Sequence, residues 1–351
     1  MYVGKKVCGG ADPGFGYRKN HPAGENATKP GWENAGKLHY FAPLGCKIGV
    51  RCRLFSFGAF VMNWQHAKPY WPFAQYSQFT LQKPHLWHIQ DIGTGPVILL
   101  IHGAGSTTHS WQHLVPFLTD RYRVIMVDLP GQGFTRLGAQ QRCGLDHMAE
   151  DLTSCLTALD LAPKVIIGHS AGVAIALRLA ELAKFDCKVI GINAALDHFR
   201  GVAGVLFPLL AKAIANMPFS SSLLSKIAGH DQTVDRILKG TGSTLTVADV
   251  KFYKELMRSR SHIGATLQMM AQWDLEPLLA RLPRLQTETH LIASSNDLAV
   301  PCATSQRAAA LLPNADYQAL PNLGHLAHEE DAATIAACIA PMLELGSASG
   351  T

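Results

Sequence analysis

The sequence predicts an α/β fold with a mainly parallel central sheet, helices on both faces and a helical cap inserted late in the chain. From residue 86 onward, short runs rich in Val, Ile and Leu alternate with longer helical segments. Such alternation is typical of right-handed β-α-β units. Several of the runs are apolar without a break, as strands buried on both faces are. A mostly helical stretch at about 198–273 then interrupts the alternation.

The expected elements follow in order along the chain. Strands are predicted at 86–90, 97–103, 122–131, 164–168, 188–194, 289–294 and 316–320. Helices are predicted at 108–120, 145–161, 171–183, 303–312 and 331–345. Ligands of such folds bind outside the carboxyl ends of the strands, so we expect the insertion to form a cap over that edge of the sheet.

Charge is distributed unevenly over the 351 residues, which carry a formal net charge of +5. Residues 1–61 hold nine Lys and Arg against three Asp and Glu, whereas the rest of the chain is nearly balanced. The main part of the chain therefore carries no basic footprint for nucleic acid. No apolar run reaches the roughly 18 residues that a membrane-spanning helix needs.

The first 61 residues also differ from the rest in composition. They contain eleven of the 31 glycines and show no sustained helical or strand period. We expect a non-native or disordered N-terminal extension there, with a translation start at Met62 as one explanation, and a single domain over 62–351. The eight cysteines include no CxxC pair. Such scattered cysteines predict reduced thiols in a cytoplasmic protein, rather than a disulfide framework or a zinc site.

One motif points to chemistry. Residues 168–172 read GHSAG and lie between the strand at 164–168 and the helix at 171–183. G-x-S-x-G at a strand-to-helix turn is the nucleophile elbow of α/β-hydrolases, which lifts a serine hydroxyl clear of the sheet. The motif therefore predicts the α/β-hydrolase fold, with Ser170 as the nucleophile.

A serine nucleophile needs a base and an orienting acid, and this fold supplies them in the chain order Ser, Asp, His. Asp297 follows the strand at 289–294, and His325 lies in the loop before the last helix. We predict that His325 accepts the proton of Ser170 and that Asp297 orients it. His328 is the rival base. Taken singly, Asp297 could equally be an aspartate that caps a turn, and His325 could be a histidine on a solvated loop.

The segment HGAG at 102–105 follows an early strand, where the fold places an oxyanion-binding loop. We expect the amides of Ala104 and Ala171 to bind the oxyanion. A phosphate-binding loop is the competing interpretation, but neither GxGxxG nor GK[ST] is present. His109 and His113 stand four residues apart but lack a third ligand at a useful spacing. No cofactor or metal is expected.

From about Asn63 to its end, the chain resembles a named family. The stretches that carry the resemblance are DLPGQGFTR, GHSAGVAIALRLA, FRGVAGVLFPLLAK, GTGS, MMAQWDLEPLL, LPRL and LPNLGHLAHEE. They are similar to the magnesium-chelatase accessory proteins of bacteriochlorophyll biosynthesis, an α/β-hydrolase family. The resemblance implies a role beside magnesium insertion into protoporphyrin IX, with chelatase subunits and a porphyrin or apolar substrate as partners. It does not supply a reaction.

Two classes of function follow. The first is a serine hydrolase acting on an ester or similar carbonyl of a tetrapyrrole-related or lipid-like compound. The second is a non-catalytic porphyrin-binding or delivery factor, and a generic carboxylesterase or C–C-bond hydrolase is a third possibility. Residues 201–219 carry one charge, so we expect an apolar cap, suited to a large flat ligand and to peripheral membrane contact. Met269, Met270 and Trp273 are candidates for lining it.

Overall fold

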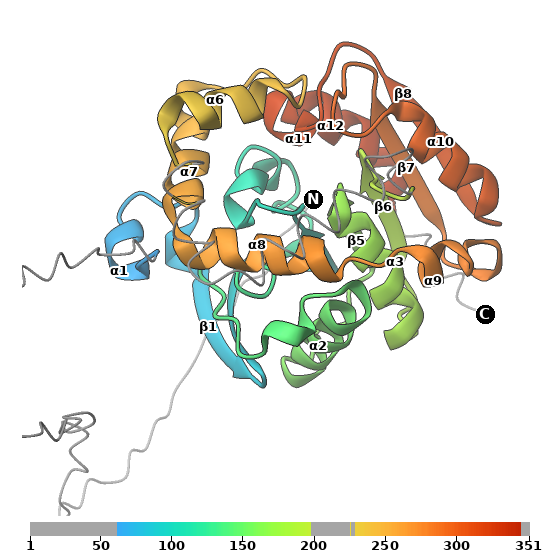
Figure 1. The fold of residues 1–351 in the computed structure, drawn as a ribbon. Helices are drawn as coiled ribbons and strands as arrows, with labels where there is room; N and C mark the ends of the chain where they lie inside the picture. Colours follow the sequence, from blue (N-terminus) through green and yellow to red (C-terminus); the bar gives the residue numbers. More distant parts are fainter. Residues whose placement is uncertain (1–61, 198–224, 226–228, 345–351) are drawn as a thin grey trace, which may run out of the picture. The chain divides into compact units, whose positions relative to one another are not determined.

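The computed structural model describes residues 62–197, 225 and 229–344. Figure 1 shows a twisted central sheet flanked by helices. Expectations for the first 61 residues and for the apolar segment 201–219 lie outside the described residues. Within the described ranges, no helix has the length and apolar character needed to cross a membrane.

The sheet has eight strands in the order β1-β2-β4-β3-β5-β6-β7-β8. Their bounds are Ser77–Gln82, His85–Ile92, Val97–Ile101, Arg123–Val127, Val165–His169, Lys188–Ile192, Thr289–Ser294 and Ala315–Leu320 for β1 to β8. Strands β3 to β8 are mutually parallel, whereas β1 and β2 form an antiparallel hairpin that joins the sheet through β4. The predicted α/β fold with a mainly parallel sheet is confirmed.

Alternating side chains of the central strands enter two separate cores. In β3, Leu99 and Ile101 face a cluster that includes residues of α2 (Leu145–Ala158) and α3 (Ala171–Ala183). Ile98 and Leu100 face the opposite cluster, which includes residues of α12 (Ala332–Ile339). All four of these strand side chains have no exposed surface. Burial on both faces explains the uninterrupted apolar run in the sequence.

The remaining helices complete the two covering layers and the cap. Their bounds are Trp64–Ala67 for α1, Asp231–Lys239 for α6, Val247–Arg258 for α7, Arg260–Gln272 for α8, Glu276–Leu279 for α9, Cys302–Leu311 for α10 and Ala327–Glu330 for α11. Helices α6, α7 and α8 belong to the insertion between β6 and β7, so its described part is helical. In Figure 1, α6 is yellow, α7 and α8 are orange, and α8 runs across the middle of the view.

Two features differ from expectation. The predicted helix over 108–120 is wrong: two 3-10 segments, η2 (Thr108–Trp111) and η3 (Val115–Phe117), stand there instead. Pro116 lies at the start of η3 and has no N–H to donate, so an α-helix through this point would lose a hydrogen bond and meet a clash. The sequence does not predict strand β1, because SQFTLQ is mostly polar. In the structure it forms a largely exposed edge strand.

Candidate active site

Ser170 lies at a sharp turn between β5 and α3. Its backbone has φ 53° and ψ −119°, a conformation that side-chain-bearing residues rarely adopt. The serine is partly exposed, and its hydroxyl makes no capping hydrogen bond to α3. This strained turn with an available hydroxyl is the geometry of a nucleophile elbow.

The two glycines of the motif are required by close backbone contacts. A Cβ at Gly168 would lie 2.7 Å from the backbone of Gly172. A Cβ at Gly172 would lie 2.3 Å from the carbonyl oxygen of Ile101 in β3. Both distances are too short for a methyl group. The glycines therefore allow α3 to start directly against the neighbouring strand.

His325 and Asp297 are joined by a short hydrogen bond. The Nδ1 atom of His325 lies 2.7 Å from Oδ2 of Asp297, whose side chain is completely buried. The other carboxylate oxygen accepts the N–H groups of Ala299 and Val300 at 2.8 and 2.7 Å. Because the carboxylate binds the protonated Nδ1, Nε2 of His325 remains as the nitrogen able to accept a proton.

Two residues missed by the sequence reasoning hold the loop of His325 against the sheet. His169, the residue before Ser170, donates from Nε2 to the carbonyl oxygen of His325 at 2.8 Å. Asn193, which follows β6, donates its amide to the same oxygen at 2.8 Å. Burial, reinforced by His328 and His325, lowers the pKa of His169 well below the ordinary value, so its ring is neutral. These bonds connect the elbow to the loop of the predicted base.

His328, the rival base, has a different environment. It is completely buried, and its ring packs 4.4 Å from that of Trp111, centroid to centroid. Burial lowers its pKa to about 3, and neither ring nitrogen has a hydrogen-bond partner within the described residues. Glu329 does not orient it, because Oε1 of that residue lies 3.9 Å from Nε2 of His328, too far for a hydrogen bond. The arrangement favours His325 as the base.

The predicted oxyanion donors lie on two segments at the same edge of the sheet. Ala171 opens helix α3, and Ala104 is exposed in the loop that follows β3. Gly105, the next residue, donates its N–H to Oε1 of Gln132 at 2.7 Å and accepts at its carbonyl from Nε2 of His262 at 3.1 Å. Gln132 and His262 were not predicted from the sequence. The loop is thus held by the segment after β4 and by cap helix α8.

A second cap helix reaches the same loop. The hydroxyl of Tyr253, on α7, lies 3.3 Å from Oγ of Ser106 and donates to Oε1 of Glu329 at 2.6 Å. Burial is the main cause that raises the pKa of Glu329 to about 8; Asp249 adds to it, and the bond from Tyr253 opposes it. The second carboxyl oxygen of Glu329 is buried without a partner among the described residues. This carboxyl therefore stays protonated at neutral pH.

The segment after β4 has a structural role, which Asp128 illustrates. Asp128 is fully buried and accepts N–H groups from Thr108 and Phe134 at 2.8 and 2.9 Å, and Nδ1 of His88 at 2.7 Å. Burial alone would raise its pKa, but the charge of His88 and the hydrogen bonds outweigh it and lower the pKa to about 2. The buried carboxylate fixes two loops at the edge of the sheet that carries Ser170.

Other candidate residues have structural surroundings. His109 contacts Oγ1 of Thr107 at 2.6 Å, and His113 contacts Oδ1 of Asp249 at 2.9 Å. In the described ranges, no group of three or more His, Cys, Asp or Glu side chains is arranged to hold a metal ion. Met269 is 1% exposed and belongs to the core cluster beneath α3, with Trp273 packed against that cluster. Met269 and Trp273 therefore pack in or against the core, although the sequence makes them candidates for lining the cap.

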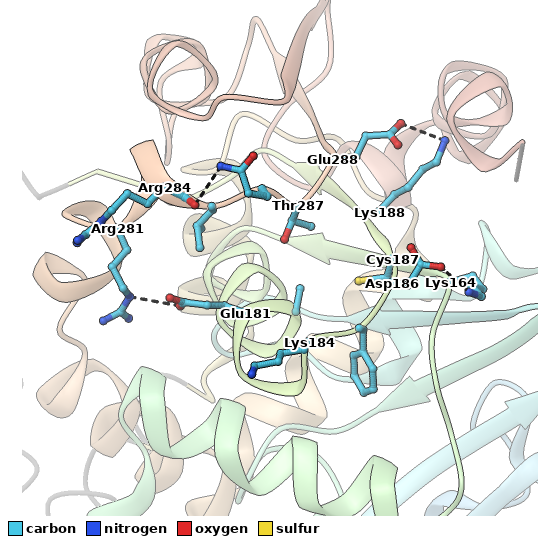
Figure 2. A pocket seen from close by; sticks show the side chains of 14 residues that line it. Lys164, Glu181, Lys184, Asp186, Cys187, Lys188, Arg281, Arg284, Thr287 and Glu288 are labelled. Carbon is cyan, nitrogen blue, oxygen red and sulfur yellow. Dashed lines mark hydrogen bonds and ion pairs between the residues drawn. The ribbon is translucent and has the colours of Figure 1, made fainter.

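A large surface cavity lies at the opposite edge of the sheet. Its volume is about 1080 Å³, and its lining includes Lys164, Lys188 and Glu288, which lie at the amino ends of β5, β6 and β7. Figure 2 shows that many of its charges are paired, as in Lys164–Asp186 and Lys188–Glu288. Ser170 and Asp297 instead follow the carboxyl ends of their strands, so this cavity is separate from the predicted triad.

Comparisons with known proteins place the chain in a family. Residues 96–332 match the family model described as alpha/beta hydrolase fold. The magnesium-chelatase 30 kDa subunit of Rhodobacter capsulatus is 43% identical over 276 residues, which cover 78% of this chain and 96% of that protein. The Karrikin insensitive 2 receptor CA of Petunia hybrida is 27% identical, covering 62% of this chain and 81% of the receptor.

Solved structures agree on the fold. A putative lipase from Acinetobacter baumannii superposes with a TM-score of 0.65 at 19% identity, covering 81% of this chain and 96% of the lipase chain. At this identity the likeness speaks for the fold alone. With the family match over most of the described residues and the 43% identical relative, the chain belongs to the α/β-hydrolase fold family, and within it to the family of the Rhodobacter capsulatus magnesium-chelatase 30 kDa subunit.

Proposed function

We propose that this protein is a serine hydrolase that acts beside magnesium chelatase in bacteriochlorophyll biosynthesis, on an apolar or tetrapyrrole-related substrate with an ester or similar carbonyl. One observation carries the hydrolase part: the buried Asp297 carboxylate holds Nδ1 of His325 at 2.7 Å, in a fold that presents Ser170 on a strained elbow. In serine hydrolases, a carboxylate-bound histidine of this kind takes the proton of the elbow serine, which supports the proposal.

The reaction proceeds through an acyl-enzyme. Nε2 of His325 accepts the proton of Ser170 while Oγ attacks the substrate carbonyl carbon, and Asp297 stabilises the resulting imidazolium. The amides of Ala104 and Ala171 bind the oxygen that becomes negative. His325 then gives the proton to the leaving group as the tetrahedral intermediate collapses. Water, deprotonated by His325, attacks the acyl-serine and releases the acid.

The link to magnesium chelatase rests on the relative whose name carries it, since the aligned region covers 96% of that protein. The proposal includes chelatase subunits as partners and a cytoplasmic location, with peripheral membrane contact through the cap. The described part of the cap agrees with a covered site, because α7 and α8 contact the loop that follows β3.

A non-catalytic binding or delivery factor is the second candidate. It is favoured by the name of the 43% identical relative, a chelatase subunit, and by the receptor name of the Petunia relative. In that case the triad is inherited without being used, and the ligand is a porphyrin held under the cap.

Genetic complementation separates the two candidates. A pigment-deficient strain lacking this gene is supplied with the wild-type gene or with Ser170→Ala. The hydrolase proposal expects wild-type rescue and no pigment with Ser170→Ala at normal protein level. Full rescue by Ser170→Ala would favour the binding factor. Lys239→Ala, an exposed substitution at the end of α6, is the control that should rescue fully.

A further inference from the structure

The amide of Ala104 belongs to a continuous chain of hydrogen bonds that begins in the cap. A peptide unit is planar, so the C=O of one residue and the N–H of the next are fixed relative to each other. The carbonyl of Gly103 shares its peptide unit with the N–H of Ala104. That carbonyl accepts the N–H of Ser106 at 3.2 Å. The N–H of Ser106 in turn shares its peptide unit with the carbonyl of Gly105.

His262 donates to the end of this hydrogen-bond series that lies farthest from the Ala104 N–H. Its Nε2 lies 3.1 Å from the carbonyl oxygen of Gly105. Its Nδ1 accepts the N–H of Gly133 at 3.1 Å, so the proton of the neutral ring is on Nε2. The side chain is completely buried, and burial lowers its pKa to about 4, which keeps the ring neutral at neutral pH. His262 is thus a fixed donor.

The end of the hydrogen-bond series nearest to Ala104 is also held in place. Nδ1 of His102 donates to the carbonyl oxygen of Gly103 at 2.7 Å, while its Nε2 accepts the N–H of Leu129 at 3.0 Å. Gly105 has φ 79°, and its N–H is bound to Gln132 at 2.7 Å. Among residues 104–106, the N–H of exposed Ala104 is the one without a hydrogen-bond partner in the described part of the chain.

We propose that His262 is a positioning residue for the oxyanion site, acting on the Ala104 amide through the peptide units 105–106 and 103–104. The inference rests on the proposed hydrolase function and deepens it. The bond from His262 fixes the tilt of the first peptide unit and, through Ser106, that of the second. Hydrogen bonds in series also polarise one another, so the Ala104 N–H becomes a stronger donor. The position of cap helix α8 thereby sets the strength of the oxyanion site.

Two substitutions separate the two bonds of His262. His262→Gln retains a donor at the reach of Nε2, and His262→Asn retains an acceptor near the position of Nδ1 but loses the bond to Gly105. The rate constant for labelling of Ser170 by a fluorophosphonate is measured for the full chain, together with kcat and KM for p-nitrophenyl acetate. Ile263→Val, a buried change on the same helix, is the packing control.

The expected result is a slowing of labelling by about tenfold in His262→Asn, with kcat falling and KM unchanged, and a slowing of less than about threefold in His262→Gln and in Ile263→Val. Equal rates for His262→Asn and wild type would overturn the inference alone. If the wild-type protein is not labelled, the hydrolase proposal fails and the inference fails with it. Should His262→Asn unfold, His262→Met and His262→Gln give the same contrast, since only Gln has a donor.

Discussion

The elbow at Ser170 and the loop at Ala104 serve the same proposed reaction but are built differently. The elbow is made by its own sequence: a Cβ at Gly172 would lie only 2.3 Å from the carbonyl oxygen of Ile101, so glycine lets α3 start directly against β3. The loop instead depends on distant side chains, from Gln132 and from His262 on the cap. A local device stays in place if the cap moves, whereas the loop depends on the cap. If the proposed reaction is correct, Ser170 keeps its geometry without the cap helices, whereas the proposed oxyanion site depends on them.

The largest effect on labelling of Ser170 is expected when the proposed base, His325, is replaced. His325→Ala should lower the rate of fluorophosphonate labelling at least about a thousandfold, because His325 is the proposed base that takes the proton of Ser170. His328→Ala should keep the labelling rate within about tenfold, since the buried ring of His328 is not oriented by Glu329. The measurement is the labelling rate at pH 7.5. Equal losses in the two variants would contradict the assignment of the base.

The local character of the elbow is tested by Gly172→Ala. The added Cβ meets the backbone oxygens of Ile101 and His102 at 2.3 and 2.7 Å, and neither strand nor helix can give way cheaply. We expect a loss of about 3 kcal/mol or more in the free energy of unfolding, measured in urea. In the matched control Gly240→Ala, the nearest atom is 3.2 Å away and the backbone is helical, so the change should stay within about 1 kcal/mol.

A pH-dependent group, Glu329 of α11, is bonded to Tyr253 of cap helix α7. Its folded-state pKa is about 8, above the ordinary carboxyl value, so the folded protein holds a proton that the unfolded chain has lost. The free energy of unfolding should therefore fall as pH rises from about 5 to 8. Glu329→Gln stays neutral and can accept the bond from Tyr253, so its stability relative to wild type should increase over that window.

We expect this relative gain to be on the order of 1–3 kcal/mol between pH 5 and pH 8. Urea unfolding at pH 5, 6.5 and 8 measures it. Glu150→Gln, at a half-exposed position, is the control and should show little such dependence. A gain that does not change with pH would mean that Glu329 is ionised in the folded protein.

The same comparison explains what the sequence could predict. Ser170 and its glycines form one motif, and Asp297 and His325 follow strands in the chain order that this fold uses. Patterns in the sequence were therefore enough to propose Ser170, Asp297 and His325 as a triad. The bonds to Gly105 join residues 27 and 157 positions apart, and no local pattern encodes them. The one available signal was a histidine at 262 within the apolar face that also carries Ala265 and Met269.

Local patterns also failed where tertiary context decides the structure. Strand β1 has only two apolar residues, Phe79 and Leu81, and both are exposed, so its short alternation is a weak signal and pairing with β2 decides the structure. The segment 108–120 is apolar enough for a helix, yet Pro116 limits it to two short 3-10 turns. The pairing partner decides the structure of β1, and Pro116 decides that of 108–120. In neither place does the spacing of apolar residues determine the secondary structure.

The most direct measurement is mass spectrometry of the full-length protein after reaction with a fluorophosphonate at pH 7.5. We predict one adduct per chain, located on the peptide that contains Ser170, and no adduct in Ser170→Ala under the same conditions. The reaction is expected to be complete within minutes in the wild-type protein and to be slowed strongly in Asp297→Asn. A folded wild-type protein that remains unlabelled, or one labelled equally after Ser170→Ala, would contradict the claim that Ser170 is an activated nucleophile.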